Sequence, residues 1–240
     1  MQNISVENLF FIDIETVSCC EHYELLTEEW KELWTEKIYK ALPDNTTPEE
    51  YYPKRAGIMA EFAKVVCISI GYLKKEKDKM QLRIKSFYSE DEKDLLERFI
   101  QTVCQLQEKS NKWCFTGHNI KEFDIPFLCR RILVNNISIP DCFNFQAMKP
   151  WDVPVVDTLH LWRFGDYKHY TSLKLLAATL GVPSPKDDID GSKVGEVYWH
   201  EKDLERIAIY CQKDVATVVN VILRFKNMPL LTDDQIVYAS

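Results

Sequence analysis

Five short apolar runs along the chain predict the strands of one central sheet. The second and third runs are continuous rather than alternating, which is typical of strands covered on both faces. The first run ends in acidic residues, so the end of its strand is expected to face solvent or a functional site. A charged stretch between the second and third runs is expected to form a hairpin turn. The predicted strands are residues 9–15, 64–72, 81–88, 113–117 and 153–157.

Apolar residues spaced at the helical period predict helices between and after these strands. One such pattern runs from Glu24 to Leu42, and Thr47-Pro48-Glu49-Glu50 is typical of a new helix start. Residues 20–60 are therefore expected to form a helical insertion between the first two strands. Further helices are predicted from a cap at Ser89 to about Glu108, from near Pro126 through Leu133, over Ser172–Leu180, and from about Glu201 to Lys226.

The order of these elements predicts an α/β fold. Three strands are followed by a helix, a strand, a helix, a strand and then helices. This order describes a mixed five-stranded sheet with helices on its faces rather than a uniform βαβ repeat. With 240 residues and 46% hydrophobic composition, the chain suits a single domain over residues 1–240 better than two. Residues 183–195, rich in Asp, Lys and Gly, are expected to be a mobile loop.

The overall charge limits how the chain could bind nucleic acid. A formal net charge of -7 gives no global basic surface, which counts against a nonspecific binder of duplexes. The same charge counts less against a metal-dependent phosphodiesterase, because bound metal ions supply local positive charge.

Cysteine usage and the N-terminal sequence predict the compartment. Eight cysteines in 240 residues are too sparse for a disulfide scaffold, and most fall in apolar patterns that predict small buried side chains. Met1–Asn8 lacks the basic and apolar regions of a signal peptide, and no stretch approaches the about 20 apolar residues of a membrane span. We therefore expect a soluble, cytoplasmic protein that makes no membrane contact.

Four carboxylates and a tyrosine lie in three separated patches of the chain. Strand alternation places Asp13 and Glu15 on the same face of the first strand. Asp124 falls where a helix begins, close to an N-cap position. Tyr210 and Asp214 are four residues apart, so they share one face of the last long helix. These side chains can converge on one site.

Converging acids are costly unless cations lie between them, and a pair of divalent ions is the best-suited occupant. Carboxylate oxygens suit Mg²⁺ or Mn²⁺, and two such ions can clamp the attacking and leaving oxygens of a phosphoryl displacement. A tyrosine hydroxyl one helical turn from a metal-binding aspartate can orient the attacking water. Each patch alone also fits a structural role, but the three together, each on a suitable element, favour a site.

The three patches resemble known exonuclease motifs. Ile12–Thr16, Gly117–Asp124 and Tyr210–Asp214 are similar to the three motifs of the DEDD superfamily, which has the ribonuclease H-like, DnaQ-type fold. A tyrosine four residues before the last aspartate is typical of the DEDDy branch, whereas the DEDDh branch would place a histidine at Ile209.

Within that branch, the chain is most similar to the proofreading domain of family B DNA polymerases in its predicted stand-alone, bacterial-type form. Residues 123–128, 156–159 and 173–191 share this likeness. The resemblance runs from about residue 8 to about residue 226, and residues 20–55 are its least typical part.

The resemblance implies a role for each acid. Asp13, Glu15 and Asp214 would hold the catalytic metal ion, Asp13 and Asp124 would hold the second, and Tyr210 would orient the water. The two ions would be Mg²⁺ or Mn²⁺. The implied activity is a 3′–5′ exonuclease that releases nucleoside monophosphates from single-stranded DNA ends. Trimming of RNA 3′ ends on the same fold stays open, as does a noncatalytic docking module. A replication or repair partner cannot be named from the sequence.

Several residues near these motifs are candidates for substrate contact. Thr16 and the Asn119–Phe123 segment would lie near the terminal nucleotide, although Thr16 could equally end the strand and Asn119 could bond within its loop. Asp157 could support the metal ligands from a second layer or cap a helix. Arg163, Lys168 and Tyr170 belong to a stretch that interleaves basic and aromatic residues, which suits a single strand. A partly buried loop would show the same pattern.

Overall fold

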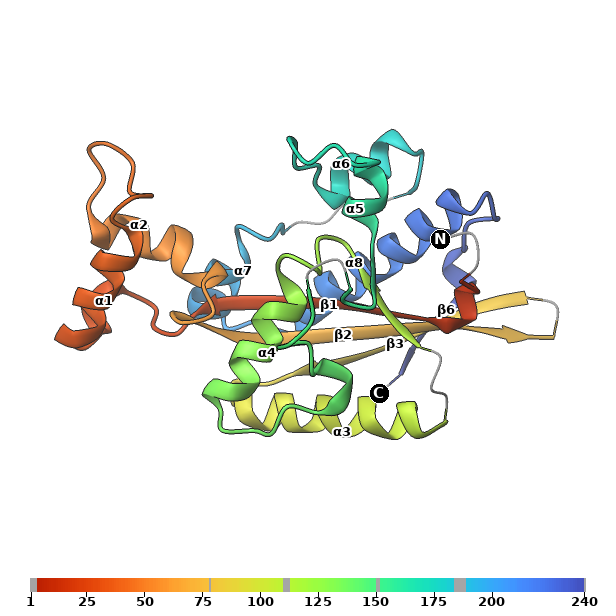
Figure 1. Ribbon diagram of the computed structural model, residues 1–240, viewed down its shortest axis with the longest axis horizontal. Coiled ribbons are helices and arrows are strands. Elements are labelled where there is room, and N and C mark those ends of the chain that lie inside the picture. Colours follow the sequence, from red (N-terminus) through yellow and green to blue (C-terminus); the bar gives the residue numbers. More distant parts are fainter. Residues whose placement is uncertain (1–3, 78, 110–112, 150–151, 184–188, 240) are drawn as a thin grey trace.

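A six-stranded mixed sheet forms the centre of the computed structural model, which describes residues 4–77, 79–109, 113–149, 152–183 and 189–239. The strands lie in the order β5-β4-β1-β2-β3-β6 (Figure 1). Their bounds are β1 Leu9–Ser18, β2 Ala63–Glu76, β3 Lys79–Tyr88, β4 Cys114–Gly117, β5 Val155–Asp157 and β6 Ile236–Ala239.

The predicted fold class is confirmed, but the predicted number of strands is wrong by one. The missed strand, β6, pairs in parallel with β3 from Leu82 opposite Ile236 to Lys85 opposite Ala239. It has only four residues, and Val237 and Tyr238 are exposed. So short and exposed an edge strand carries little of the buried apolar pattern by which strands are predicted.

The strand β1 lies at the centre of the sheet and joins two kinds of pairing. It runs antiparallel to β2 along most of its length, and parallel to β4 only over Leu9–Phe11. Beyond Phe11, the edge of β1 that faces β4 is therefore open to other partners. This is the part of the strand that carries the first two acids.

Helices cover both faces of the sheet (Figure 1). On one face, α3 (Glu92–Lys109) and α4 (Asp124–Val134) pack against Phe10, Ile12 and Ile14 of β1. On the other face, α8 (Leu204–Phe225) packs against Leu9 and Phe11. Strand alternation then places Asp13 and Glu15 on the α8 face. Two shorter helices, α5 (Thr158–Arg163) and α6 (Leu173–Thr179), lie beside α8.

The predicted helical insertion is confirmed as α1 (Glu28–Ile38) and α2 (Pro48–Arg55). The helix α2 begins at a capping box in which Thr47 and Glu50 satisfy each other's backbone N–H groups. Trp34 is fully buried and donates its ring N–H to the Pro48 carbonyl at 2.9 Å. Its role is therefore packing within the insertion.

The loop predicted over residues 183–195 is only partly a loop. Residues 184–188 lie outside the described part of the chain. A short helix α7 (Val194–Glu196) and a π-helical turn (Val197–Glu201) follow, so the prediction of loop up to Gly195 is wrong at its end. Val194 and Val197 are buried against Val17 of β1. That tertiary contact stabilises a helix too short to predict from its own sequence.

In the described part of the chain, no helix combines the length and apolar character needed to cross a membrane.

Candidate active site

The strand β1 presents Asp13 and Glu15 on one face, opposite residues of β2. Asp13 lies across from Ser69 and Glu15 lies across from Cys67. The register shifts directly after Glu15, so that Thr16 pairs with Val65. A bulge of this kind increases the local twist and re-aims side chains, and such bulges are frequent beside active sites.

The open edge of β1 is occupied by Asp124. The Ile14 N–H donates to Asp124 Oδ1 at 3.2 Å, and Asp124 is the first residue of α4. Asp124 therefore lies one position inside the helix rather than at its N-cap, which is Phe123. Gly117 lets the chain turn toward this position, because a Cβ there would lie 2.7 Å from the Ile12 carbonyl oxygen.

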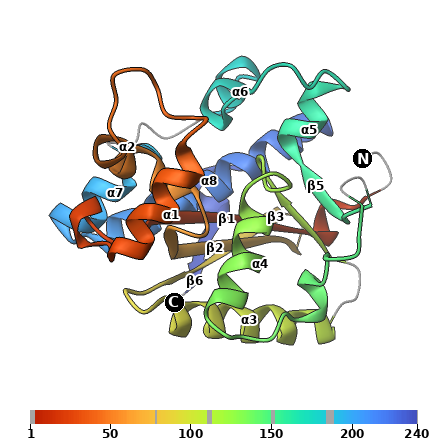
Figure 2. The same ribbon diagram turned by 60° about the vertical axis from the view of Figure 1, so that its left-hand side comes forward.

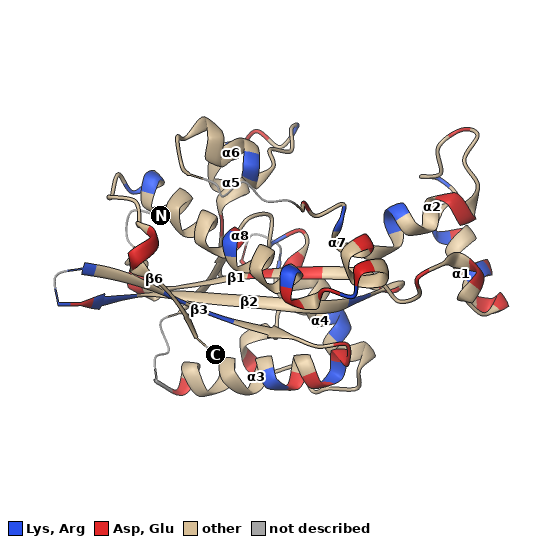
Figure 3. Ribbon diagram, turned by 180° about the vertical axis from the view of Figure 1, so that it is seen from behind, with Lys and Arg blue, Asp and Glu red and all other residues tan. Residues whose placement is uncertain are grey.

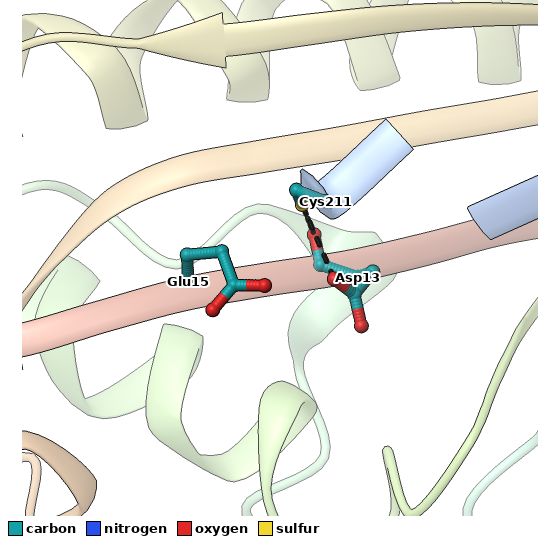
Figure 4. A group of neighbouring side chains, drawn as sticks. All are labelled: Asp13, Glu15 and Cys211. Carbon is teal, nitrogen blue, oxygen red and sulfur yellow. Dashed lines mark hydrogen bonds between the residues drawn. The ribbon is translucent and has the colours of Figure 1, made fainter. Parts of the chain in front are cut away.

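The helix α8 brings Tyr210, Cys211 and Asp214 over the acids of β1. The Cys211 thiol donates to Asp13 Oδ2 at 3.2 Å (Figure 4). The Tyr210 hydroxyl forms a hydrogen bond with the Asp214 carboxylate. Close seating of α8 depends on Gly71 of β2, since a Cβ there would lie 2.9 Å from a methyl group of Val215.

The four acids influence one another electrostatically, as expected of carboxylates gathered at one place. Burial raises the pKa of Asp13 well above its ordinary value, and the charges of Asp214 and Asp124 raise it further. Burial and the charge of Asp13 likewise raise the pKa of Glu15. Burial raises the pKa of Asp124 to about 7, even though backbone hydrogen bonds oppose the shift. Ionising all of these groups together is unfavourable without a positive counter-charge.

The donor set fits hard divalent cations. Oxygen atoms of Asp13 and Glu15 lie with Cys211 Sγ in one group whose atoms are within 4.8 Å of each other. Burial raises the pKa of the Cys211 thiol well above its ordinary value, so the sulfur keeps its proton and donates to Asp13. The available ligands are therefore carboxylate oxygens, which Mg²⁺ and Mn²⁺ prefer.

Asp157 has a clear structural role at the start of α5. Its Oδ1 accepts the Leu159 N–H at 2.9 Å and caps the helix, which is one of the two roles expected from the sequence. Its carboxylate also accepts the N–H groups of Asn119 and Lys121, both at 3.0 Å. Asp157 therefore fixes the loop that leads to Asp124, and its charge raises the pKa of Asp124.

Thr16, Asn119 and Phe123 all lie close to the acids. Thr16 Oγ1 donates to the Gly57 carbonyl at 2.6 Å and so ties β1 to the end of the insertion. Asn119 adopts a left-handed backbone conformation with φ 63°. Its side-chain oxygen is buried without a hydrogen-bond partner in the described structure. The ring of Phe123 packs on Phe127 and borders the cavity described below.

The stretch that interleaves basic and aromatic residues divides into paired and exposed side chains. The Arg163 side chain is only 8% exposed and donates to Glu122 Oε1 at 2.7 Å. Lys168 and Tyr170 are exposed. Burial raises the pKa of Tyr170, and the charges of Asp124 and Asp157 raise it further, so its hydroxyl lies within electrostatic range of the acids. Of this stretch, Tyr170 is thus the residue that the fold brings toward the site.

A cavity of about 870 Å³ lies beside the acid cluster, with Glu15 and Phe123 among its lining residues. It runs along the end of β1 to the insertion and to the segment around α7. Sequence reasoning did not identify any part of the insertion as a lining of the site. Cys211 was also missed, because its apolar neighbours predict a buried hydrophobic residue. Its position directly after Tyr210 was the available signal, since that places it three residues before Asp214 on the same helix.

The chain belongs to the family of predicted 3′–5′ exonucleases related to the exonuclease domain of PolB, whose family model matches residues 58–236. The match includes Asp124, Tyr210 and Asp214 but begins after Asp13 and Glu15. These two acids are placed beside the others by the fold itself.

The fold is also similar to that of the family B DNA polymerase from the hyperthermophilic archaeon Pyrobaculum calidifontis. The TM-score is 0.52 and the sequence identity is 16%, over 90% of this chain and 24% of the polymerase chain. At this identity the similarity shows the fold alone, and this chain spans about a quarter of the polymerase. No curated protein matches the sequence.

Proposed function

We propose that this protein is a metal-dependent 3′–5′ exonuclease that removes nucleoside monophosphates from single-stranded DNA ends. The main support is the convergence of Asp13, Glu15, Asp124 and Asp214 from three elements, with burial and mutual repulsion raising the pKa of the first three. Buried acids that repel one another cost stability, and a cation site compensates for that cost. Membership of a family related to a polymerase exonuclease domain supports nucleic acid as the substrate.

The acids have separate roles in this proposal. Asp13, Glu15 and Asp214 would hold one divalent ion, and Asp13 together with Asp124 would hold the second. When bound, such ions supply positive charge to the attacking and leaving oxygens of the phosphoryl group. Asp13 takes part in both sites, and its carboxylate is held in place by the thiol of Cys211.

Tyr210 orients the attacking water. Burial and the charges of Asp214, Glu15 and Asp13 raise the pKa of its hydroxyl above the ordinary value, so the tyrosine stays protonated at neutral pH. It therefore acts as a hydrogen-bonding group and not as the base that removes the proton. Water adds to phosphorus and the bond to the 3′ oxygen of the preceding nucleotide breaks. One proton of the water passes to that oxygen, so the strand ends in a 3′-hydroxyl and a nucleoside 5′-monophosphate leaves.

The direct test uses single-stranded DNA labelled at either the 5′ or the 3′ end, with Mn²⁺ or with a chelator. The wild-type protein should shorten the 5′-labelled strand one nucleotide at a time and release the 3′ label as a mononucleotide. Asp13→Ala and Asp214→Ala should each lower the rate by at least about 10²-fold. Tyr210→Phe should slow the reaction and leave Mn²⁺ binding largely unchanged.

An exposed acid away from the site provides the matched control. Asp44 lies in the turn between α1 and α2, and Asp44→Ala should retain full activity. Undiminished digestion by a clean Asp13→Ala preparation would overturn the assignment. A matched RNA oligonucleotide in the same assay decides between DNA and RNA, because none of the candidate residues is assigned to read a 2′-hydroxyl group.

A further inference from the structure

The cavity beside the acids is walled on one side by the insertion, which neither the family match nor the four acids explain. Its volume is about 870 Å³, and its lining includes Glu15, Thr16, Lys54, Arg55 and Trp199. From Glu15 to Ser18 the strand covers three residue steps, about 10 Å of extended chain. The far end of the cavity is thus well beyond the reach of the nucleotide being cleaved. Figures 1 and 2 both place α2 beside α7 at this end of β1.

Most cations near the site already have partners within the protein. Arg163 donates to Glu122, and Lys64 donates to the Tyr198 hydroxyl at 2.8 Å. Lys202 lies over the ring of Trp199 at 5.1 Å. Among the described residues, Lys54 and Arg55 have no acid within ion-pair distance, and both are exposed. Figure 3 shows Lys and Arg at the end of α2 that is directed toward α7.

The end of α2 is firmly attached to β1. Thr16 Oγ1 donates to the Gly57 carbonyl at 2.6 Å, and the Cys19 N–H donates to the Phe62 carbonyl at 2.8 Å. Tyr52 and Ala56 are fully buried on either side of Lys54 and Arg55. The backbone that carries the two cations is therefore fixed relative to the acids, while their side chains are exposed.

Acidic residues also line the cavity, namely Glu15, Glu21 and Glu196. Glu21 Oε1 lies 3.4 Å from His22 Nε2 and 3.5 Å from His200 Nδ1, and it forms ion pairs with these imidazoles only when they are protonated. Glu196 is exposed at the rim. Glu15 belongs to the metal-binding group and is neutralised when that group is filled.

We propose that this cavity holds the phosphodiester backbone of the single strand upstream of its 3′ end, with Lys54 and Arg55 binding its phosphates. The inference rests on the proposed function and adds a role for the insertion, which is to hold the strand while its end is cleaved. The indole of Trp199, already contacted by Lys64 and Lys202, borders the same cavity. The negative net charge of -7 makes such a local grip necessary, because the overall field of the protein repels the strand.

The test compares two substrates that differ in reach. A p-nitrophenyl ester of thymidine 5′-monophosphate fills only the cleavage position, whereas a single-stranded oligonucleotide extends through the cavity. The variants are Lys54→Glu, Arg55→Glu and the corresponding changes to Gln. Lys40→Glu, an exposed lysine of the same insertion outside the cavity lining, is the control.

Each change to Gln should raise the KM for the oligonucleotide about tenfold, the loss expected for one charge-assisted hydrogen bond. The changes to Glu should raise the KM further, and Lys40→Glu should match the wild type. Hydrolysis of the small ester should stay unchanged in every variant, which also shows that the fold is intact. Running the oligonucleotide as DNA and as RNA identifies which backbone the cavity favours.

Binding measured in Ca²⁺ at several salt concentrations provides a second readout. Loss of two phosphate contacts in the Lys54→Gln, Arg55→Gln double variant should lower the salt slope by about 1.4, twice the single-strand value per contact. An unchanged slope and an unchanged KM in the variants, with an active wild type, would overturn the role of the insertion. If the wild type hydrolyses neither substrate in Mn²⁺, the proposed exonuclease function itself fails.

Discussion

Two groups of buried charges lie on opposite faces of the sheet, and they are organised in opposite ways. On the α3 and α4 face, Glu92 and Arg131 form a two-pronged ion pair, with N–O distances of 2.9 and 2.6 Å. The remaining atoms are also satisfied, because Glu92 accepts the Val65 N–H and an Asn135 side-chain N–H, and Arg131 donates to the Ala60 carbonyl. The second group, Asp13, Glu15 and Asp214 on the α8 face with Asp124 at the open edge of β1, consists entirely of acids.

The difference indicates that the first group stabilises the fold, whereas the second serves function. The Glu92–Arg131 network carries no net charge and needs no external partner, so it can stabilise the fold under all conditions in which both groups are ionised. The acid cluster has raised pKa values because its members repel each other and are buried. The cluster has no positive counter-charge of its own, as is expected of a site that binds cations.

The largest effect is expected from breaking the paired network. Glu92→Gln removes the carboxylate and leaves the Arg131 charge buried without a counter-ion, so the free energy of unfolding should fall by about 3–5 kcal/mol. Urea denaturation measures the change. Glu97→Gln on the same helix is the control, since its pair with Lys93 is exposed and contributes at most about 1 kcal/mol. Equal losses in the two variants would contradict the role of the buried Glu92–Arg131 pair in stabilising the fold.

The next effect concerns Gly117, which connects β4 to the loop of the acid cluster. In Gly117→Ala, the new methyl group would lie 2.2 Å from Ile120 Cγ2 and 2.7 Å from the Ile12 carbonyl oxygen. Overpacking of this kind costs about 1–3 kcal/mol. Activity should fall as well, because Asp124 follows this turn. Gly195→Ala meets no atom within 4 Å and should leave thermal stability unchanged or slightly higher. A Gly117→Ala protein as stable as the wild type would show that the turn can move freely.

A smaller effect is expected from pH on the metal-free protein. The pKa values of Asp13, Glu15 and Asp124 are raised above the unfolded values of 3.8 and 4.5, so the folded state binds protons more tightly. Their contribution to stability is fully present below about pH 4 and is lost as pH rises through the folded values, about 7 for Asp124. The melting temperature in a chelator should therefore fall between pH 4 and pH 7.

Two comparisons sharpen this pH test. Adding Mn²⁺ should raise the melting temperature more at pH 7.5 than at pH 5, because the ion competes with protons for the same oxygens. Glu15→Gln should flatten the pH profile, since one of the repelling acids is gone. A melting temperature in chelator that rises steadily from pH 4 to pH 7 would mean that the acids do not repel one another as described.

The smallest effect is expected at Cys211. Its thiol is a neutral donor to Asp13, so Cys211→Ser keeps a donor and should change activity little. Cys211→Ala removes a hydrogen bond of about 1 kcal/mol, and the Mn²⁺ concentration for half-maximal activity should rise a few-fold. Equal behaviour of the Ser and Ala variants would show that the thiol contributes only its volume.

Much of the site could be predicted because it depends on local patterns. Alternation along β1 places Asp13 beside Glu15, and the helical period places Tyr210 beside Asp214. The remaining features depend on tertiary contacts. The pairing of Arg163 with Glu122 joins residues 41 apart in the chain, and no local pattern could show that this arginine is already engaged.

The position of the insertion relative to the acids and the helical turn at Val194–Glu201 were harder still. Lys54 and Arg55 end a helix whose own sequence gives no sign of its distance from the acids, and the bond from Thr16 to Gly57 sets that distance. The short segment at Val194–Glu201 becomes helical because Val194 and Val197 are buried against β1. In each case, a contact between distant parts of the chain decides the outcome.

The most direct test of the contrast between the two regions is the thermal unfolding of Asp13→Asn in a chelator at pH 8. Asparagine can still accept the Cys211 thiol, but it removes one of the repelling charges. We predict a melting temperature about 2–4 °C above that of the wild type, which corresponds to a gain of about 1 kcal/mol in the free energy of unfolding. The variant should no longer digest DNA in Mn²⁺. A variant that melts below the wild type would show that Asp13 serves folding, and it would contradict the assignment of the cluster to function.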